Sequence, residues 1–486
     1  MVIDADLTRA SKPSALAILL EQGRLWAMTG VAGFLLAGAF VFRSEWTLWQ
    51  GLVWGSVGLI AAGWHRDVLS VWRESLLFRG AVCWLLWMLG VSFLLGGLGE
   101  NEAKSYQNWC WGGVGLVAWW VMLYHTGRDA VRTQILGWMV ITAAAYSALA
   151  SILHYGFLMP DWHWGKRLGN VLVYGGWNQV CSGLTWAFAA IWALLLGMRG
   201  EQNRWLRWLA WCAHGVLVFA ALATLSRGAL LVLIVGHVAT LIYGGRKNGG
   251  GVAFMRFLTV FAIFHAVLPG TLPEEDGSGR YPRVIDSNPL VEWSRRADTG
   301  RLAMYEAVSR AMQAGGATMW FVGDGQWALN SRWNQSIEEA PHHPHSVFVA
   351  TALHGGLMGL AGLLLILGLG LKQGHELAGR AGGSAWPLGV VLALAGLSGV
   401  VFDGHSLASL DSVPRFEPLI VWPGLLLAAG RRTQDAGRRR GGSGSEAGFR
   451  EIDRFSKCLS PCPAAEQPHW LRQSLAAEAA ALAGSK

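Results

Sequence analysis

Three histidines stand together where the longest polar stretch of the chain ends, in the run Pro341-His342-His343-Pro344-His345-Ser346. An apolar run follows directly. An imidazole titrates near neutral pH, so a histidine here could act as a general base toward a hydroxyl group. The three side chains could also hold a metal ion, or could be interfacial polar residues in front of a helix. The residue types alone leave these interpretations open.

A second candidate is the tripeptide Ser226-Arg227-Gly228, which separates two apolar runs with almost no loop between them. An ionisable side chain at such a position is costly without a partner, and is therefore a functional candidate. A guanidinium keeps its charge and matches phosphate oxygens with its fork of donors. The alternative is an arginine whose side chain extends to the membrane interface.

The composition defines the setting of these residues. Of 486 residues 53% are hydrophobic and only 14% charged, whereas soluble chains carry about 25% charged residues. The mean hydropathy is +0.34, and Gly (64) and Trp (28) are abundant, as in membrane helices and at membrane interfaces. These values exclude a soluble enzyme, a disordered chain and a secreted disulfide scaffold. The six cysteines are too few for a disulfide framework, and the net charge of +8 fits basic cytoplasmic loops.

The hydropathy pattern predicts an all-α polytopic membrane protein with about 12 transmembrane helices. The predicted spans are 24–42, 46–64, 80–98, 109–125, 134–153, 176–197, 207–223, 227–243, 253–269, 346–371, 385–402 and 417–430. One alternate set of loops carries roughly twice as many Lys and Arg residues as the other. The positive-inside rule assigns the richer set, and with it both termini, to the cytoplasm.

This orientation places the one long loop outside the cytoplasmic membrane, with Arg227 and His345 on the same side. The predicted parts are spans one to nine (1–269), the long loop (270–345), spans ten to twelve (346–430) and a basic, loosely ordered cytoplasmic tail (431–486). Within the loop, apolar residues at helical spacing predict an amphipathic helix over 301–314 that ends at Gly315-Gly316. Gly323-Asp324-Gly325 predicts a tight turn.

The order of these motifs resembles the O-antigen ligase and polymerase superfamily of bacterial membrane glycosyltransferases. The resemblance covers roughly 210–370: Ser226-Arg227-Gly228, then Gly300-Arg301 with Tyr305 four residues on, then the Gly-x-Gly turn, then His343-Pro344-His345 before a Gly-rich span. Ser346 stands where the family usually has Asn, and Tyr305 where Trp is common. The family's further loop arginine has four competing candidates: Arg280, Arg283, Arg295 and Arg296.

The resemblance implies a metal-independent enzyme without a cofactor in the bacterial inner membrane, acting on its periplasmic face. Its donor would be a glycan on polyprenyl (undecaprenyl) diphosphate, and its acceptor lipid A-core or another glycan, with no role for nucleic acid. His345 would be the general base, and Arg227 and Arg301 would stabilise the leaving diphosphate with inversion at the sugar. Further substrate contacts would be Ser226, Arg280, Arg283, Arg296, Tyr305 and His343.

Three alternatives stay open at this stage. The same motifs occur in glycan polymerases and in protein O-oligosaccharyltransferases, and they do not distinguish the acceptors. Twelve spans with both termini inside is also a common transporter arrangement. A transporter often has two similar halves, and no such repeat is evident here.

Overall fold

The computed structural model describes most of the apolar part of the chain. The described residues are 15–42, 65–95, 102–159, 167–173, 179–199, 203–244, 252, 254–259, 301–325, 344–380, 387–404, 407 and 416–440. All regular structure in these residues is helical. The helices at the N-terminal end of the chain are α1 (Ala15–Val41), α3 (His65–Glu74), α4 (Leu76–Leu95), α5 (Glu102–Gly127) and α6 (Ala130–Leu153), which continues into the π-helical turn η1 (His154–Leu158). They are followed by α7 (Gln179–Gly197), α8 (Arg204–Ala223), α9 (Arg227–Gly244), α12 (Arg301–Ala314), α13 (Gly316–Phe321), α14 (Val347–Arg380), α15 (Leu388–Asp403) and α16 (Phe416–Arg440).

Seven of the helices in this part of the chain are long and apolar enough to cross a membrane. They begin in α1, α4, α6, α7, α8, α9 and α14, and α15 is a shorter apolar helix. The predicted polytopic, all-helical class is therefore confirmed, while the count of twelve is not. The predicted span 46–64 lies outside the described residues, as does most of 253–269.

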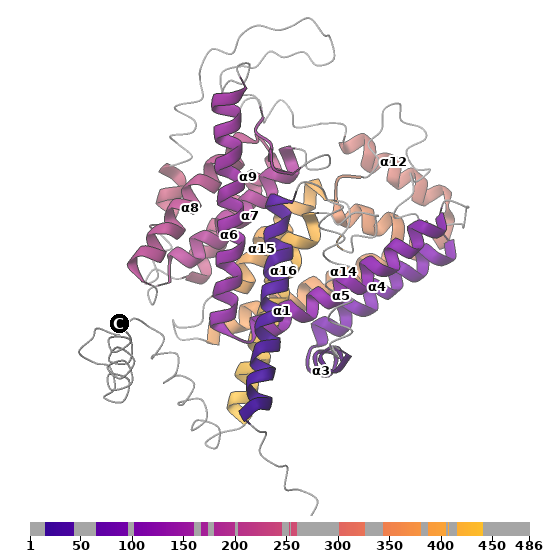
Figure 1. Ribbon diagram of the computed structural model, residues 1–486. Coiled ribbons are helices and arrows are strands. Elements are labelled where there is room, and N and C mark those ends of the chain that lie inside the picture. The colour runs from indigo at the N-terminus through magenta and orange to yellow at the C-terminus, as the bar shows by residue number, and fades with distance from the viewer. Residues whose placement is uncertain are drawn as a thin grey trace, which may run out of the picture. The chain divides into compact units, whose positions relative to one another are not determined.

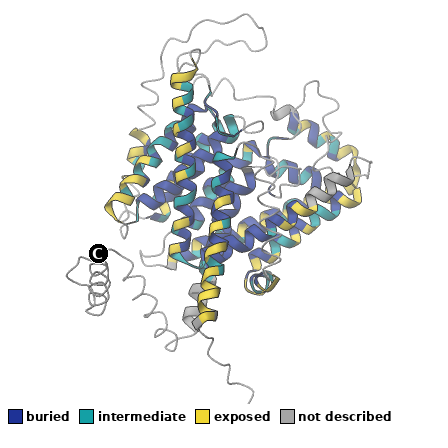
Figure 2. Ribbon diagram, viewed as in Figure 1, coloured by how far each residue is buried: buried dark blue, intermediate teal, exposed yellow. Residues whose placement is uncertain are grey.

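The compact unit Met1–Thr433 has α7 at its centre. Every residue of α7 from Ser182 to Gly197 is buried, and α7 packs against α6, α8, α9 and α15 (Figures 1 and 2). Glycines allow the close approach: a Cβ on Gly236 of α9 would overlap the Ile191 side chain of α7. Small residues serve the same purpose in membrane helices generally. The rest of the chain, Gln434–Lys486, forms a separate unit.

One end of the helix bundle is closed by the short segment 167–173. The Asn170 side chain donates to the Phe40 carbonyl at the end of α1 (2.9 Å), and its backbone N–H donates to Ser182 Oγ near the start of α7 (3.1 Å). Leu168 N–H donates to the Ala223 carbonyl at the end of α8 (3.0 Å). We call this the site end of the bundle.

The other end brings together the last turn of α5, the start of α15 and the middle of α16. A Cβ on Gly430 would overlap the Tyr124 carbonyl, and a Cβ on Gly389 would lie 2.6 Å from Ala428 Cβ. These contacts let α16 pass directly against two neighbours. We call this the opposite end.

Candidate active site

Arg227 is the first residue of α9, and a tight turn after α8 presents it at the site end. Leu225 has a positive φ of 51°, and the Ser226 hydroxyl accepts a hydrogen bond from Ala229 N–H (3.3 Å). Ser226 is thus the N-cap of α9, and it is buried. Arg227 itself is half-buried. The predicted break between two apolar runs is a three-residue connection, 224–226.

His345 lies two residues before the start of α14, as Leu225 lies two residues before the start of α9. It has a positive φ of 53°, and Ser346 follows as the residue before α14, its carbonyl accepting from Ala350 N–H (2.8 Å). Leu225 and His345 are the two non-glycine residues with positive φ among those described. Such a conformation costs about 1–3 kcal/mol and is held by its surroundings. Both helices that carry candidate residues are therefore entered through a strained residue followed by serine.

The end of α15 connects these two helix starts. A Cβ on Gly228 would lie 2.7 Å from the Asp403 carboxylate, and a Cβ on Gly404 would lie 2.5 Å from the Val347 side chain. Asp403 and Gly404 are adjacent, so the beginnings of α9 and α14 both contact the end of α15. Arg227 and His345, 118 positions apart in the numbering, therefore lie at one end of the bundle on either side of Asp403. Sequence analysis named Arg227 and His345 as site residues but did not include Asp403.

The helix α14 is broken at Gly356, ten residues after Ser346. Gly356 has φ 64° and ψ −172° within α14, and the turn Gly323-Asp324-Gly325 is inserted at this point. Asp324 N–H donates to the Leu353 carbonyl (3.0 Å), and Gly325 N–H donates to the His354 carbonyl (3.1 Å).

Helix α4 also donates hydrogen bonds to α14 near the break. Trp87 Nε1–H donates to the Gly355 carbonyl (3.1 Å), and Trp84 Nε1–H donates to the Gly359 carbonyl (3.0 Å). A buried backbone carbonyl must be hydrogen-bonded, above all within a membrane. The turn and Trp87 thus replace donors that an unbroken helix would supply, and Trp84 adds a contact one turn further along α14.

A polar side-chain pair fixes the turn to α14. His354 is buried, and its Nδ1 lies 2.7 Å from Asp324 Oδ1. The predicted turn is confirmed by positive φ at Gly323 (87°) and Gly325 (66°). The sequence did not reveal that the turn is held inside a membrane helix.

The loop helix α12 packs beside this break. It spans Arg301–Ala314, as predicted, and Met304, Val308 and Met312 form a buried cluster with Leu353 of α14. Tyr305, the aromatic residue of the motif, is half-buried. Arg301 is the first residue of α12.

The segment 167–173 contributes a contact that sequence analysis did not predict. Arg167 Nε–H donates to the Thr224 carbonyl (2.9 Å) in the turn before Arg227. This contact holds the turn that presents Arg227, so the segment acts as a support for the site.

Several predicted site residues lie outside the described part of the chain. They are Arg280, Arg283, Arg296 and His343. Their assignment, and the alternative of a metal site formed by His342, His343 and His345, stay predictions. The structure brings together Ser226, Arg227 and His345, and gives Ser226 a role as helix cap.

The motif region also matches a known family. Residues 212–364 match the family model described as O-antigen ligase. This part of the chain is similar to the O-antigen ligase family. The matched range runs from within α8 to within α14 and includes Arg227, Arg301, Asp324, His345 and His354. A search of curated proteins gave no match.

The match confirms the predicted resemblance to the O-antigen ligase and polymerase superfamily. It supports a membrane enzyme of the ligase or polymerase type. Within the O-antigen ligase region lie both helix starts, the broken helix α14 and the turn that repairs it.

Proposed function

We propose that the protein transfers a glycan from a polyprenyl diphosphate to a sugar hydroxyl, with lipid A-core as the acceptor. The observation that carries the proposal is the convergence of Arg227, His345 and Asp403 at one end of the bundle, inside a region of the O-antigen ligase family. A cation that cannot lose its charge, next to a histidine, suits displacement of a diphosphate by a hydroxyl.

The proposed reaction needs one displacement at the anomeric carbon. The acceptor oxygen forms the new C–O bond while the bond to the diphosphate breaks, so the configuration inverts. The imidazole of His345 takes the hydroxyl proton. The polyprenyl diphosphate leaves with the electron pair, and Arg227 and Arg301 stabilise its charge. Asp403 adds a carboxylate beside the start of α9, next to Gly228.

The proposed orientation has the site end in the periplasm. At the opposite end lie the basic residues Arg128, Arg199, Arg204, Arg431 and Arg432, whereas Arg167 and Arg227 lie at the site end. A surplus of arginine on one side favours the cytoplasm for that side. A polyprenyl-linked glycan that has been carried across the inner membrane would then meet the site directly.

Reconstitution with a polyprenyl-diphosphate glycan and purified acceptor tests the mechanism. We expect His345→Ala to lower the transfer rate about 10²–10⁴-fold, the typical contribution of a general base. Arg227→Ala should lower it about 10²–10³-fold, the typical effect of removing one donor that stabilises developing negative charge. Arg204→Ala, an exposed arginine at the opposite end, is the matched control and should keep normal activity. Unchanged melting temperatures would show that the inactive variants are folded. Near-normal transfer by His345→Ala would exclude it as the base.

The same assay tests whether the transfer reaction needs a divalent metal ion. We expect EDTA to leave the transfer rate almost unchanged, because arginines supply the positive charge for the leaving group. Strong inhibition that is reversed by a divalent cation would favour the metal site at His342, His343 and His345 instead.

The identity of the acceptor distinguishes a ligase from a polymerase and from a protein oligosaccharyltransferase. In a deletion strain, loss of every glycan band above the lipopolysaccharide core supports a ligase, and a remaining single-repeat band indicates a polymerase. An unchanged lipopolysaccharide with loss of glycoprotein indicates a protein oligosaccharyltransferase. Solute transport that survives loss of His345 and Arg227, with normal surface glycan, would favour the transporter alternative.

A further inference from the structure

A pocket opens at the opposite end of the bundle, far along the helices from Arg227 and His345. It has a volume of about 670 Å³, part of which is open to solvent. Five stretches of chain form it, from the α5–α6 turn, the end of α7, the later part of α14, the start of α15 and the middle of α16. Its lining residues are Gly127, Ala130, Thr133, Arg199, Gly374, Leu377, Pro387, Leu388, Gly389, Val390, Leu427, Ala428 and Arg431.

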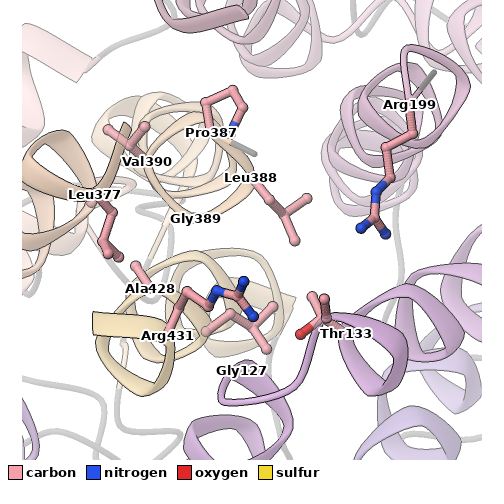
Figure 3. A pocket seen from close by; sticks show the side chains of 13 residues that line it. Gly127, Thr133, Arg199, Leu377, Pro387, Leu388, Gly389, Val390, Ala428 and Arg431 are labelled. Atoms are coloured by element: carbon pink, nitrogen blue, oxygen red, sulfur yellow. The ribbon is translucent and has the colours of Figure 1, made fainter. Parts of the chain in front are cut away.

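Two arginines give the pocket its charge. Arg199 and Arg431 are both half-buried, and their guanidinium groups reach into the pocket from two sides (Figure 3). Arg199 Nη1 donates to Gln134 Oε1 (2.9 Å), which holds the guanidinium in place. No lining residue among the thirteen is acidic.

Two carboxylates close in sequence to the lining residues have contacts of their own. Glu376 forms an ion pair with Arg432 (3.0 Å), the neighbour of Arg431. Asp129 caps α6, accepting from Val131 N–H (2.8 Å) and Arg132 N–H (2.9 Å). The lining residues themselves include two arginines and no acidic residue.

The start of α15 adds to this positive potential. Leu388, Gly389 and Val390 line the pocket, and they are the first three residues of the helix. Their N–H groups have no acceptor inside the helix, and Pro387 supplies no side-chain cap. The helix dipole favours an anion at this end.

The remaining wall is apolar and lies at the end of membrane-crossing helices. Leu377, Val390 and Leu427 form much of it. Arginines above an apolar wall match a group that carries phosphate at one end and hydrocarbon at the other. Basic pockets between transmembrane helices bind anionic lipid head groups by this combination.

We propose that this pocket binds the phosphate head group of an anionic membrane phospholipid, held by Arg199 and Arg431, with its glycerol and upper acyl chains against the leucines. The site is separate from the proposed transfer chemistry. It would tie α7, α15 and α16 together through a lipid at the end of the bundle that has most of the basic residues.

Binding to the full-length protein in detergent tests the proposal. Phosphatidylglycerol and phosphatidylcholine with identical acyl chains, and inorganic phosphate, would be titrated and followed by native mass spectrometry and melting temperature. We expect phosphatidylglycerol to bind and to raise the melting temperature, and phosphatidylcholine to do neither. Inorganic phosphate should act only at far higher concentration. Equal binding of both lipids, or equal protection by inorganic phosphate, would overturn the proposal.

Variants locate the site. Arg199→Gln/Arg431→Gln should weaken phosphatidylglycerol binding at least about tenfold, since each arginine supplies charge-assisted hydrogen bonds. Arg432→Gln removes the same charge from the next position of α16, where the side chain pairs with Glu376, and should change binding by less than about twofold. The charge-preserving Arg199→Lys/Arg431→Lys variant guards against a folding failure and should bind with intermediate affinity. Equal affinity of the double Gln variant and wild type would refute the site.

Discussion

His354 links the membrane helix α14 to the loop turn at Asp324. Its imidazole is buried and shares a 2.7 Å hydrogen bond with the carboxylate, which is 16% exposed. A hydrogen bond to a charged group contributes about 1.5–3 kcal/mol to stability, and removal of one partner leaves the other desolvated. The pair therefore contributes to the attachment of the turn.

Replacement of Asp324 tests this contribution. We expect Asp324→Ala to lower the melting temperature by several degrees, because His354 loses its partner, and Asp324→Asn to lower it less, because an oxygen acceptor remains. Glu306→Ala is the control: its ion pair with Arg310 is exposed and should contribute little. Equal melting temperatures for Asp324→Ala and Glu306→Ala would show that the pair does not hold the turn.

At the scale of elements, the broken helix α14 is the feature that the site depends on. Gly356 has a positive φ, and a Cβ there would overlap the Phe321 carbonyl group at the end of α13. Alanine at this position would be strained by its own backbone and would push the 323–325 turn out of the break.

We expect Gly356→Ala to lower both the melting temperature and the yield of folded protein. Gly368→Ala on the same helix is the matched control, since a Cβ there meets nothing within 4 Å. It should be neutral or stabilising by up to about 1 kcal/mol, the helix preference of Ala over Gly. Comparable stability of the two variants would contradict the structural role of the break.

Sequence patterns predicted the elements that depend on local residues. The helix 301–314 followed from the spacing of its apolar residues and from the glycines after it, and the turn at 323–325 followed from Gly-Asp-Gly. The break in α14 could not be predicted, because the run around His354-Gly355-Gly356 is as apolar as an unbroken span. Its donors come from Asp324, Gly325 and Trp87, which are distant in sequence.

The same holds for the site residues: those marked by local sequence could be predicted, and those placed by long-range packing could not. Arg227 and His345 could be proposed because each stands at a conspicuous boundary between polar and apolar sequence. Asp403 could not, because its relation to Arg227 depends on how α15 packs against α9. The pocket of Arg199 and Arg431 likewise needs five separate stretches of chain to come together.

At the scale of the whole molecule, the two ends of the bundle should face different compartments. The prediction concerns Arg310, exposed on α12, and Arg204, exposed at the start of α8 at the opposite end. In a cysteine-free background we expect Arg310→Cys to react with a membrane-impermeant maleimide in intact spheroplasts. Arg204→Cys should react only after lysis. Labelling of both residues in intact cells, or the reverse pattern, would contradict the orientation.

The repaired break in α14 also has a consequence for biogenesis. When α14 leaves the translocation machinery, the carbonyls of Leu353, His354 and Gly355 need donors that lie on the turn 323–325 and on α4. Both partners precede α14 in the chain, so they are already made when it arrives. We therefore expect α14 to need the turn 323–325 in order to assemble. A chimera that carries a relative's loop in place of 301–325 should fold only if the new loop also donates hydrogen bonds to these α14 carbonyls.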